Sequence, residues 1–165
     1  MSYDFSSAAD LARWATDQTK IDTDYTASGI GKTVGGVRQF DCCGLFKCFM
    51  WHDYPKNGAS WYGKTQPDYN CEQLLAEATI KGPMSTIPEV PGTLVYQKQH
   101  MGIYIGGGYV VECTARRWGS VGHKVLISQF KNARGAFYRG TWTYWFQSPH
   151  LTYSAAAPAA PAALS

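Results

Sequence analysis

A triple glycine between two short apolar segments is the feature that most limits how this chain can fold. Residues 100–114 read HMGIYIGGGYVVECT, with Gly106, Gly107 and Gly108 at the centre. Glycine-rich loops of two or three residues are common connections in β-hairpins. The segment therefore predicts two antiparallel strands, over residues 100–105 and 109–114.

The register of this hairpin decides which polar side chains meet. If the three glycines form the loop, the predicted pairs are Ile105–Tyr109, Tyr104–Val110, Ile103–Val111 and Gly102–Glu112. Side chains alternate along a strand, so Glu112 then lies diagonal to His100 on the same face. A slip of one residue would separate the two side chains. We expect Glu112 to accept a hydrogen bond from one ring nitrogen of His100.

An upstream cysteine is expected to open a helix. Residues 40–50 read FDCCGLFKCFM, and Asp41 is a favoured N-cap residue. Apolar residues then recur with helical spacing, at Cys42, Leu45, Phe46, Phe49 and Met50. Cys42 falls in the first turn, where the positive end of the helix dipole favours thiolate over thiol. Gly44, which has no side chain, lets another backbone or a substrate approach this turn closely.

A thiol, an imidazole and a carboxylate in this order are the parts of a cysteine hydrolase. Glu112 would orient His100, and the second ring nitrogen of His100 would take the proton of Cys42. The sequence thus predicts catalytic roles for Cys42, His100 and Glu112.

Two further cysteines leave the choice of nucleophile open. Cys43 lies about 100° round the helix from Cys42. Cys71, in YNCEQLL, stands at the start of a second helix that Asp68 or Asn70 can cap. Cys43 is thereby off the centre of the apolar face, whereas Cys42 and Cys71 each also fit an ordinary buried cysteine packed in a core.

The spacing of the histidines and cysteines predicts neither a metal site nor a cofactor. His52, His100, His123, His150 and the five cysteines form no Cys-x-x-Cys pair and no His-Glu-x-x-His motif. Asp22 and Asp24 could ligate calcium, but two alternating aspartates are more often a solvated turn.

Taken together, four segments resemble the NlpC family of bacterial cell-wall cysteine peptidases. These are DCCGL (41–45), PGTLVY (91–96), HMGIYIGGG (100–108) and VVECT (110–114). The resemblance implies a papain-like fold, Cys42 as nucleophile, His100 as base and Glu112 as third polar residue. It also implies that the backbone N–H of Cys42 contributes to an oxyanion hole, and that the substrate is a peptide of bacterial peptidoglycan.

Substrate-binding residues are expected around this centre. Asp41 occupies the place of a family aspartate that binds the substrate amine in some members, and Tyr25 matches a tyrosine that lines the site. Arg116 and Trp118 follow the hairpin at the rim of the groove, where an arginine can hold a substrate carboxylate. Three departures separate the chain from the family pattern. They are Cys43 for serine, Glu112 for histidine, and a longer segment over 24–40 without the usual tryptophan.

Two other functions compete with an NlpC-type peptidase. A CHAP-type amidase or endopeptidase, also papain-like, can use the same three residue types. A non-catalytic wall-binding domain could keep the fold without the activity. The presence of all three polar groups in order favours an enzyme.

Composition limits the partners. The net charge is +3 and no basic tract is present, so we expect no nucleic acid as partner. The N-terminus has no secretory pattern, and we find no membrane-spanning segment. We expect a monomer, made in the cytoplasm of a phage-infected host and released at lysis to act on the cell wall. The resemblance suggests the catalytic domain of a phage endolysin.

The pattern along the chain predicts an α+β fold with N-terminal helices packed on a central antiparallel sheet. Helices are expected over 7–18, 41–52 and from Asp68 or Asn70 to about 78. Strands are expected near 93–98, 100–105, 109–114 and 123–127, with an aromatic strand pair within 135–147. Loops are expected over 19–40, 53–67 and 82–92. The catalytic domain would span 1–153, and the Ala/Pro-rich residues 154–165 would link it to a missing C-terminal module.

Overall fold

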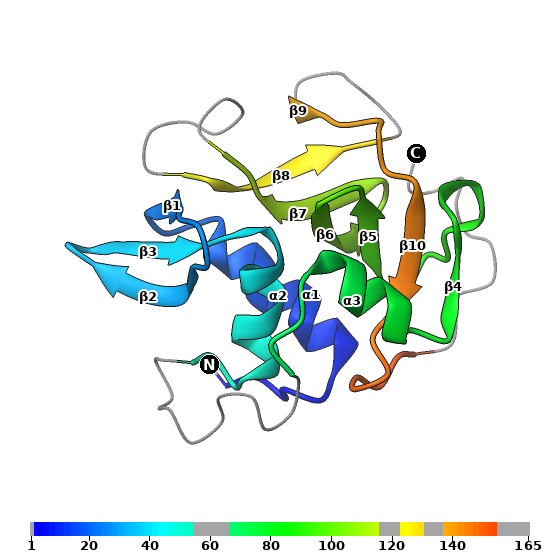
Figure 1. Cartoon of the computed structure of the whole chain (residues 1–165), viewed down its shortest axis with the longest axis horizontal. Helices are drawn as coiled ribbons and strands as arrows, with labels where there is room; N and C mark the ends of the chain where they lie inside the picture. Colours follow the sequence, from blue (N-terminus) through cyan, green and yellow to red (C-terminus); the bar gives the residue numbers. More distant parts are fainter. Residues whose placement is uncertain (1, 55–66, 116–122, 131–136, 155–165) are drawn as a thin grey trace.

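A seven-stranded sheet forms the centre of the molecule (Figure 1). The computed structural model describes residues 2–54, 67–115, 123–130 and 137–154. The strand order is β4-β10-β5-β6-β7-β8-β9, antiparallel except for the last pair. The strands are β4 (Ile80–Pro83), β5 (Leu94–Gln97), β6 (His100–Gly106), β7 (Tyr109–Cys113), β8 (Val125–Gln129), β9 (Phe137–Tyr138) and β10 (Tyr144–Gln147). Together with the helices, this arrangement confirms the predicted α+β class and its antiparallel sheet.

The three predicted helices are present, and each has a side-chain cap. They are α1 (Ala8–Gln18), α2 (Cys42–Met50) and α3 (Cys71–Glu77). Ser7 caps α1, and Asn70 caps α3 through a reciprocal capping box with Gln73. Asp68, the other candidate cap of α3, is instead paired with Lys47 at 2.5 Å.

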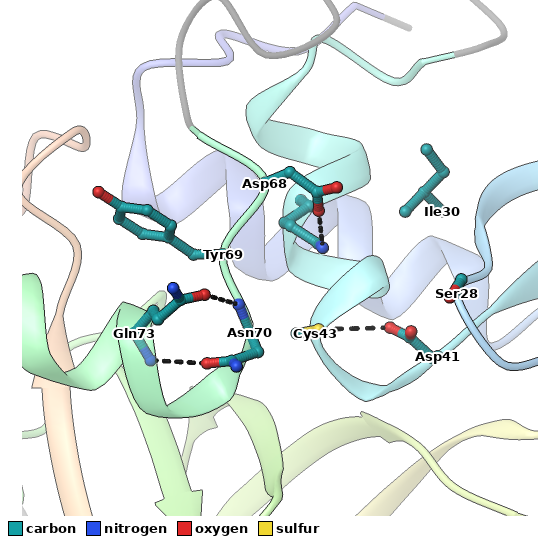
Figure 2. A pocket seen from close by; sticks show the side chains of 9 residues that line it. Ser28, Ile30, Asp41, Cys43, Asp68, Tyr69, Asn70 and Gln73 are labelled. Carbon is teal, nitrogen blue, oxygen red and sulfur yellow. Dashed lines mark hydrogen bonds and ion pairs between the residues drawn. The ribbon is translucent and has the colours of Figure 1, made fainter.

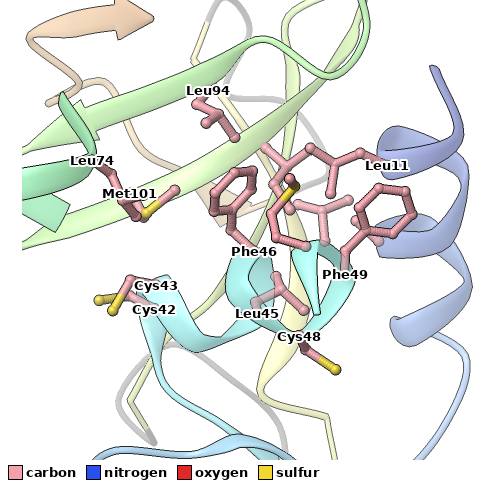
Figure 3. Close-up of a cluster of buried hydrophobic side chains, with 14 of the residues drawn as sticks. Leu11, Cys42, Cys43, Leu45, Phe46, Cys48, Phe49, Leu74, Leu94 and Met101 are labelled. Atoms are coloured by element: carbon pink, nitrogen blue, oxygen red, sulfur yellow. The ribbon is translucent and has the colours of Figure 1, made fainter. Parts of the chain in front are cut away.

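Helices α1 and α2 pack on strands β6 and β7 and bury the main core. Figure 3 shows Phe46 and Phe49 of α2 between Leu11 of α1 and the sheet residues Leu94 and Met101. A second cluster, formed by Val95, Tyr104, Val110 and Trp142, lies on the other side. Side chains alternate along each strand, so these two clusters occupy opposite faces of the sheet. Within the described residues no helix is long and apolar enough to cross a membrane.

The expectation of a loop over 19–40 is wrong, because a small second sheet lies there. Strands β1 (Thr23–Tyr25), β2 (Ile30–Val34) and β3 (Val37–Phe40) pair in the order β1-β3-β2. Gly35 and Gly36, both with positive φ, form the two-residue turn between β2 and β3. These strands are short and rich in polar residues, and Arg38 of β3 links them to α1 and to the chain after α2. Its guanidinium is buried and bonds Asp53 at 2.6 Å and Gln18 at 2.9 Å.

Two other expectations about strands need correction. The chain between 82 and 92 is not entirely a connection, because β4 extends to Pro83 at the edge of the sheet. Strands β9 and β10 do not pair with each other. Strand β9 pairs with β8, whereas β10 lies between β4 and β5. There Phe146 of β10 joins the helix-side core, which explains why β10 pairs with β5.

Candidate active site

Asp41 fixes the start of the cysteine helix. Its side chain accepts the backbone N–H of Gly44 at 2.5 Å and caps α2 as predicted. A Cβ at Gly44 would lie only 1.8 Å from the backbone oxygen of Gly29. Glycine therefore lets the β1–β2 connection approach the first turn, which confirms the predicted close approach of another backbone.

A pocket of about 390 Å³ opens beside this helix start (Figure 2). Its lining residues are Ser28, Ile30, Asp41, Cys43, Lys47, Asp68, Tyr69, Asn70 and Gln73. Cys43, rather than Cys42, faces this pocket, and its thiol lies 3.4 Å from Oδ1 of Asp41. Cys43 is also as deeply buried as Cys42, although its place on the helix predicted a position off the centre of the apolar face.

Three thiols gather at the starts of α2 and α3. The Sγ atoms of Cys42, Cys43 and Cys71 all lie within 4.8 Å of one another, and those of Cys42 and Cys71 are 3.5 Å apart. Hydrogen bonds from Cys43 and then Cys71 lower the pKa of Cys42 to about 4. The same bonds raise the pKa of Cys43 and of Cys71. These hydrogen bonds favour the thiolate at Cys42 over a thiolate at Cys43 or Cys71.

The alkylation rate of Cys42 is expected to be nearly constant from pH 5.5 to 7.5 in reduced, metal-free protein. An ordinary thiol, with a pKa near 8.5, reacts about tenfold faster per pH unit in this range because its thiolate fraction grows. Cys42 has a lowered pKa and is already ionised throughout. Its absolute rate need not be high, since nucleophilicity falls as thiol pKa falls.

The measurement is the pH dependence of iodoacetamide labelling, resolved by tandem mass spectrometry of the peptide that contains Cys42 and Cys43. Cys48, which is buried in the same helix, serves as the internal comparison. A tenfold rise per pH unit at Cys42 would show an ordinary thiol.

The hairpin brings His100 and Glu112 together as the register predicted. The pairs Ile103–Val111 and Tyr104–Val110 are confirmed, but Gly106 rather than Ile105 pairs with Tyr109. Gly107 and Gly108 both have positive φ, 66° and 88°, as a two-residue hairpin turn requires. A bulge absorbs the extra residue before Gly106. The register farther from the turn is therefore unchanged, and His100 Nε2 lies 2.7 Å from Glu112 Oε1.

Sequence reasoning missed the residues that surround Glu112. The Glu112 side chain is fully buried, and Arg139 Nε approaches its Oε1 to 2.8 Å. Ser128 donates its hydroxyl to the other carboxylate oxygen at 2.5 Å. The ring of Trp142 stacks on His100 with a centroid separation of 5.4 Å and an interplanar angle of 12°.

These contacts assign the roles of the two His100 nitrogens. A carboxylate paired with Arg139 can only accept hydrogen bonds, so Nε2 of His100 carries the proton that it donates. The Nδ1 atom then keeps its lone pair and can act as a base. The stacked ring of Trp142 limits the rotation of the His100 imidazole. The arrangement suits a general base with a fixed tautomer, supported by the partly buried cation of Arg139.

The turn before His100 places the chain next to Cys42. Gln99 has a positive φ of 61°, and its N–H donates to Glu72 of α3 at 2.8 Å. Its carbonyl oxygen lies 3.8 Å from the Sγ of Cys42. Glu72 also accepts the hydroxyl of Tyr96, so α3 ties this turn to the cysteine cluster.

The structure does not join all three predicted catalytic residues. Within the described residues, the hydrogen bonds of the Cys42 thiol involve its neighbouring thiols, Tyr25 and the Gln99 carbonyl, not the His100 ring. His100 stacks on Trp142 of the second cluster, whereas Cys42 belongs to the helix-side core. The thiol therefore lies beside the peptide that leads into His100.

Of the four predicted substrate-binding residues, two are in the described part of the chain. Tyr25 lies close to the thiol: burial, followed by the negative charges of Cys42 and Asp41, raises the pKa of its hydroxyl. Asp41 borders the pocket. Arg116 and Trp118 lie outside the described residues, as does the 154–165 segment apart from Ser154.

Comparison with known proteins adds no relative. No family model matches the chain, and a search of curated proteins finds no significant match.

Proposed function

We propose that this protein is a cysteine peptidase that cleaves peptide bonds in bacterial peptidoglycan, on a papain-like fold of the NlpC type. The observation that carries the proposal is the contact of the half-buried His100 with the buried Glu112, backed by Arg139, one residue from a carbonyl that contacts the Cys42 thiol. The wall substrate rests on the resemblance of the four segments to the NlpC family.

In the proposed reaction, the Cys42 thiolate attacks the carbonyl carbon of the scissile bond. The first N–H groups of a helix have no partner within the helix, so the N–H of Cys42 is available for the developing oxyanion. Nδ1 of His100 takes up the proton that the Cys42 thiol releases and gives it to the leaving amine, and a thioester forms on Cys42. Water, deprotonated by Nδ1, then hydrolyses the thioester.

The proposal requires the thiol and the imidazole to approach each other when substrate binds. Catalytic hydrogen bonds are often long or absent without substrate and tighten in the complex. A substrate chain entering between α3 and the small sheet would displace the Cys42 thiolate from Cys71. Rotation about the Cα–Cβ bond of Cys42 would then redirect its Sγ toward the start of β6.

The test is digestion of purified peptidoglycan of known composition, with mass spectrometry of the soluble fragments. We expect fragments with new peptide amino termini from the wild type and none from Cys42→Ala. The matched control is Cys48→Ser, a buried cysteine of the same helix. Release of complete stem peptides from muramic acid would indicate the CHAP-type amidase instead. Sedimentation with the wall but no fragments, on all wall types, would indicate a non-catalytic binding domain.

A further inference from the structure

The three clustered thiols form a unit that the proposed reaction does not need. Catalysis uses one nucleophile, yet Cys71 comes from a different helix to lie 3.5 Å from Cys42, and Cys43 adjoins both. All three residues are buried, with at most 9% of their surface exposed. Outside the cluster, Cys42 contacts the Gln99 carbonyl at 3.8 Å and the Tyr25 hydroxyl, and Cys43 contacts Asp41 at 3.4 Å.

The separations suit a thiophilic metal ion. In a tetrahedral zinc site the Zn–S distance is about 2.3 Å, which places neighbouring sulfur atoms about 3.8 Å apart. The Sγ atoms here are 3.5 Å apart in one pair and within 4.8 Å in the others. Small side-chain rotations therefore bring all three to bonding distance of one central point.

The surroundings fit the charge of such a site. Three thiolates and one Zn²⁺ leave a net charge of −1, and a carboxylate as fourth ligand makes it −2, so a nearby positive group would stabilise the site. The buried ammonium of Lys47 lines the same pocket as Cys43, where it pairs with Asp68 at 2.5 Å. Oδ1 of Asp41, 3.4 Å from the Cys43 sulfur, supplies an oxygen that can fill the fourth position.

We infer that Cys42, Cys43 and Cys71 bind one Zn²⁺ ion, with Asp41 as the oxygen ligand. The sequence concealed this site because Cys71 lies far along the chain from the adjacent pair, outside any short zinc-ligand spacing. Binding would occupy Cys42, so the metal and a wall substrate would exclude each other. That consequence, but not the binding itself, rests on the proposed function.

The test uses Co²⁺ as a spectroscopic probe on reduced, metal-free protein under nitrogen. We expect one Co²⁺ per chain, visible bands of a tetrahedral ion, and a near-ultraviolet sulfur-to-metal charge-transfer band that Zn²⁺ abolishes. Cys71→Ser should lose about a third of that band, one of three thiolates, and weaken binding about 100-fold or more, beyond the loss typical of outer-shell changes. Cys48→Ser and Cys113→Ala should bind as the wild type does.

A second measurement covers the case in which Cys71→Ser fails to fold. Zn²⁺ should raise the melting temperature of the wild type with a concentration dependence that follows its binding curve. Cys43→Ser should reduce that rise.

Three results would overturn the inference. The first is the absence of a charge-transfer band, and the second is equal affinity in the wild type and in both cysteine variants. The third is a wild-type protein that shows a Cys42–Cys71 disulfide in non-reducing peptide maps and binds no metal after reduction. The cluster would then be a redox pair. None depends on wall digestion, so failure of the proposed function would be seen separately.

Discussion

Replacement of Cys42 by serine is expected to lower the rate of peptidoglycan cleavage by roughly 10³-fold or more. Loss of the attacking atom removes the covalent step, and nucleophile substitutions in acyl-transfer enzymes cost several orders of magnitude. A serine hydroxyl keeps the volume and the hydrogen bonds of the site but stays protonated at neutral pH. Binding to the wall should be nearly unchanged, so the loss should appear in kcat and not in KM.

Cys43→Ser is the informative partner of this variant. The two residues are adjacent and equally buried, but the Cys43 thiol lies against Asp41, whereas that of Cys42 lies beside the Gln99 carbonyl. We expect Cys43→Ser to lower the rate of peptidoglycan cleavage by less than about tenfold. The loss would come from the altered hydrogen bond to the Cys42 thiolate. The rates of fragment release from purified wall, compared at equal far-ultraviolet circular dichroism, decide between them. If Cys43→Ser is inactive and Cys42→Ser is active, the nucleophile is Cys43, the residue that faces the pocket.

Local sequence patterns predicted the elements that carry these residues. Ser7, Asp41 and Asn70 each lie directly before a run with helical spacing, and a capping bond involves only nearby backbone. The glycines at 106–108 limited the hairpin to few registers, so the His100–Glu112 contact was predictable from alternation. The bulge was not predictable, yet it left this contact intact because it lies on the turn side of the pair.

Contacts between distant segments explain what the sequence did not predict. Arg139 is 27 residues from Glu112, and no period or cap signals that they pair. Cys71 is 29 residues from Cys42, and its approach depends on where α3 packs. The strands of the small sheet carry mixed polar residues such as Lys32 and Arg38, which give no alternation. Their structure depends on the buried Arg38–Asp53 pair, which again joins distant segments.

Arg139→Met is expected to lower the free energy of unfolding by about 3–5 kcal/mol. The Glu112 side chain is fully buried and that of Arg139 is 11% exposed. Removing one partner of a buried ion pair leaves an uncompensated charge, and this costs far more than the pair itself contributes. Ser128 and His100 would remain as donors to the carboxylate, but neither is a permanent cation. The measurement is urea unfolding followed by tryptophan fluorescence.

Two comparisons separate the lost charge from lost packing, since methionine also changes the contact with Trp142. The double variant Arg139→Met/Glu112→Gln should recover at least half of the loss, because no buried charge remains. Lys20→Met breaks an exposed pair with Asp17, in which the side chains are 69% and 38% exposed, and should change stability by less than about 0.5 kcal/mol. If Arg139→Met costs no more than Lys20→Met, then Arg139 does not compensate a buried carboxylate. The fixed tautomer of His100, and with it the base of the proposed reaction, would then lose its main structural support.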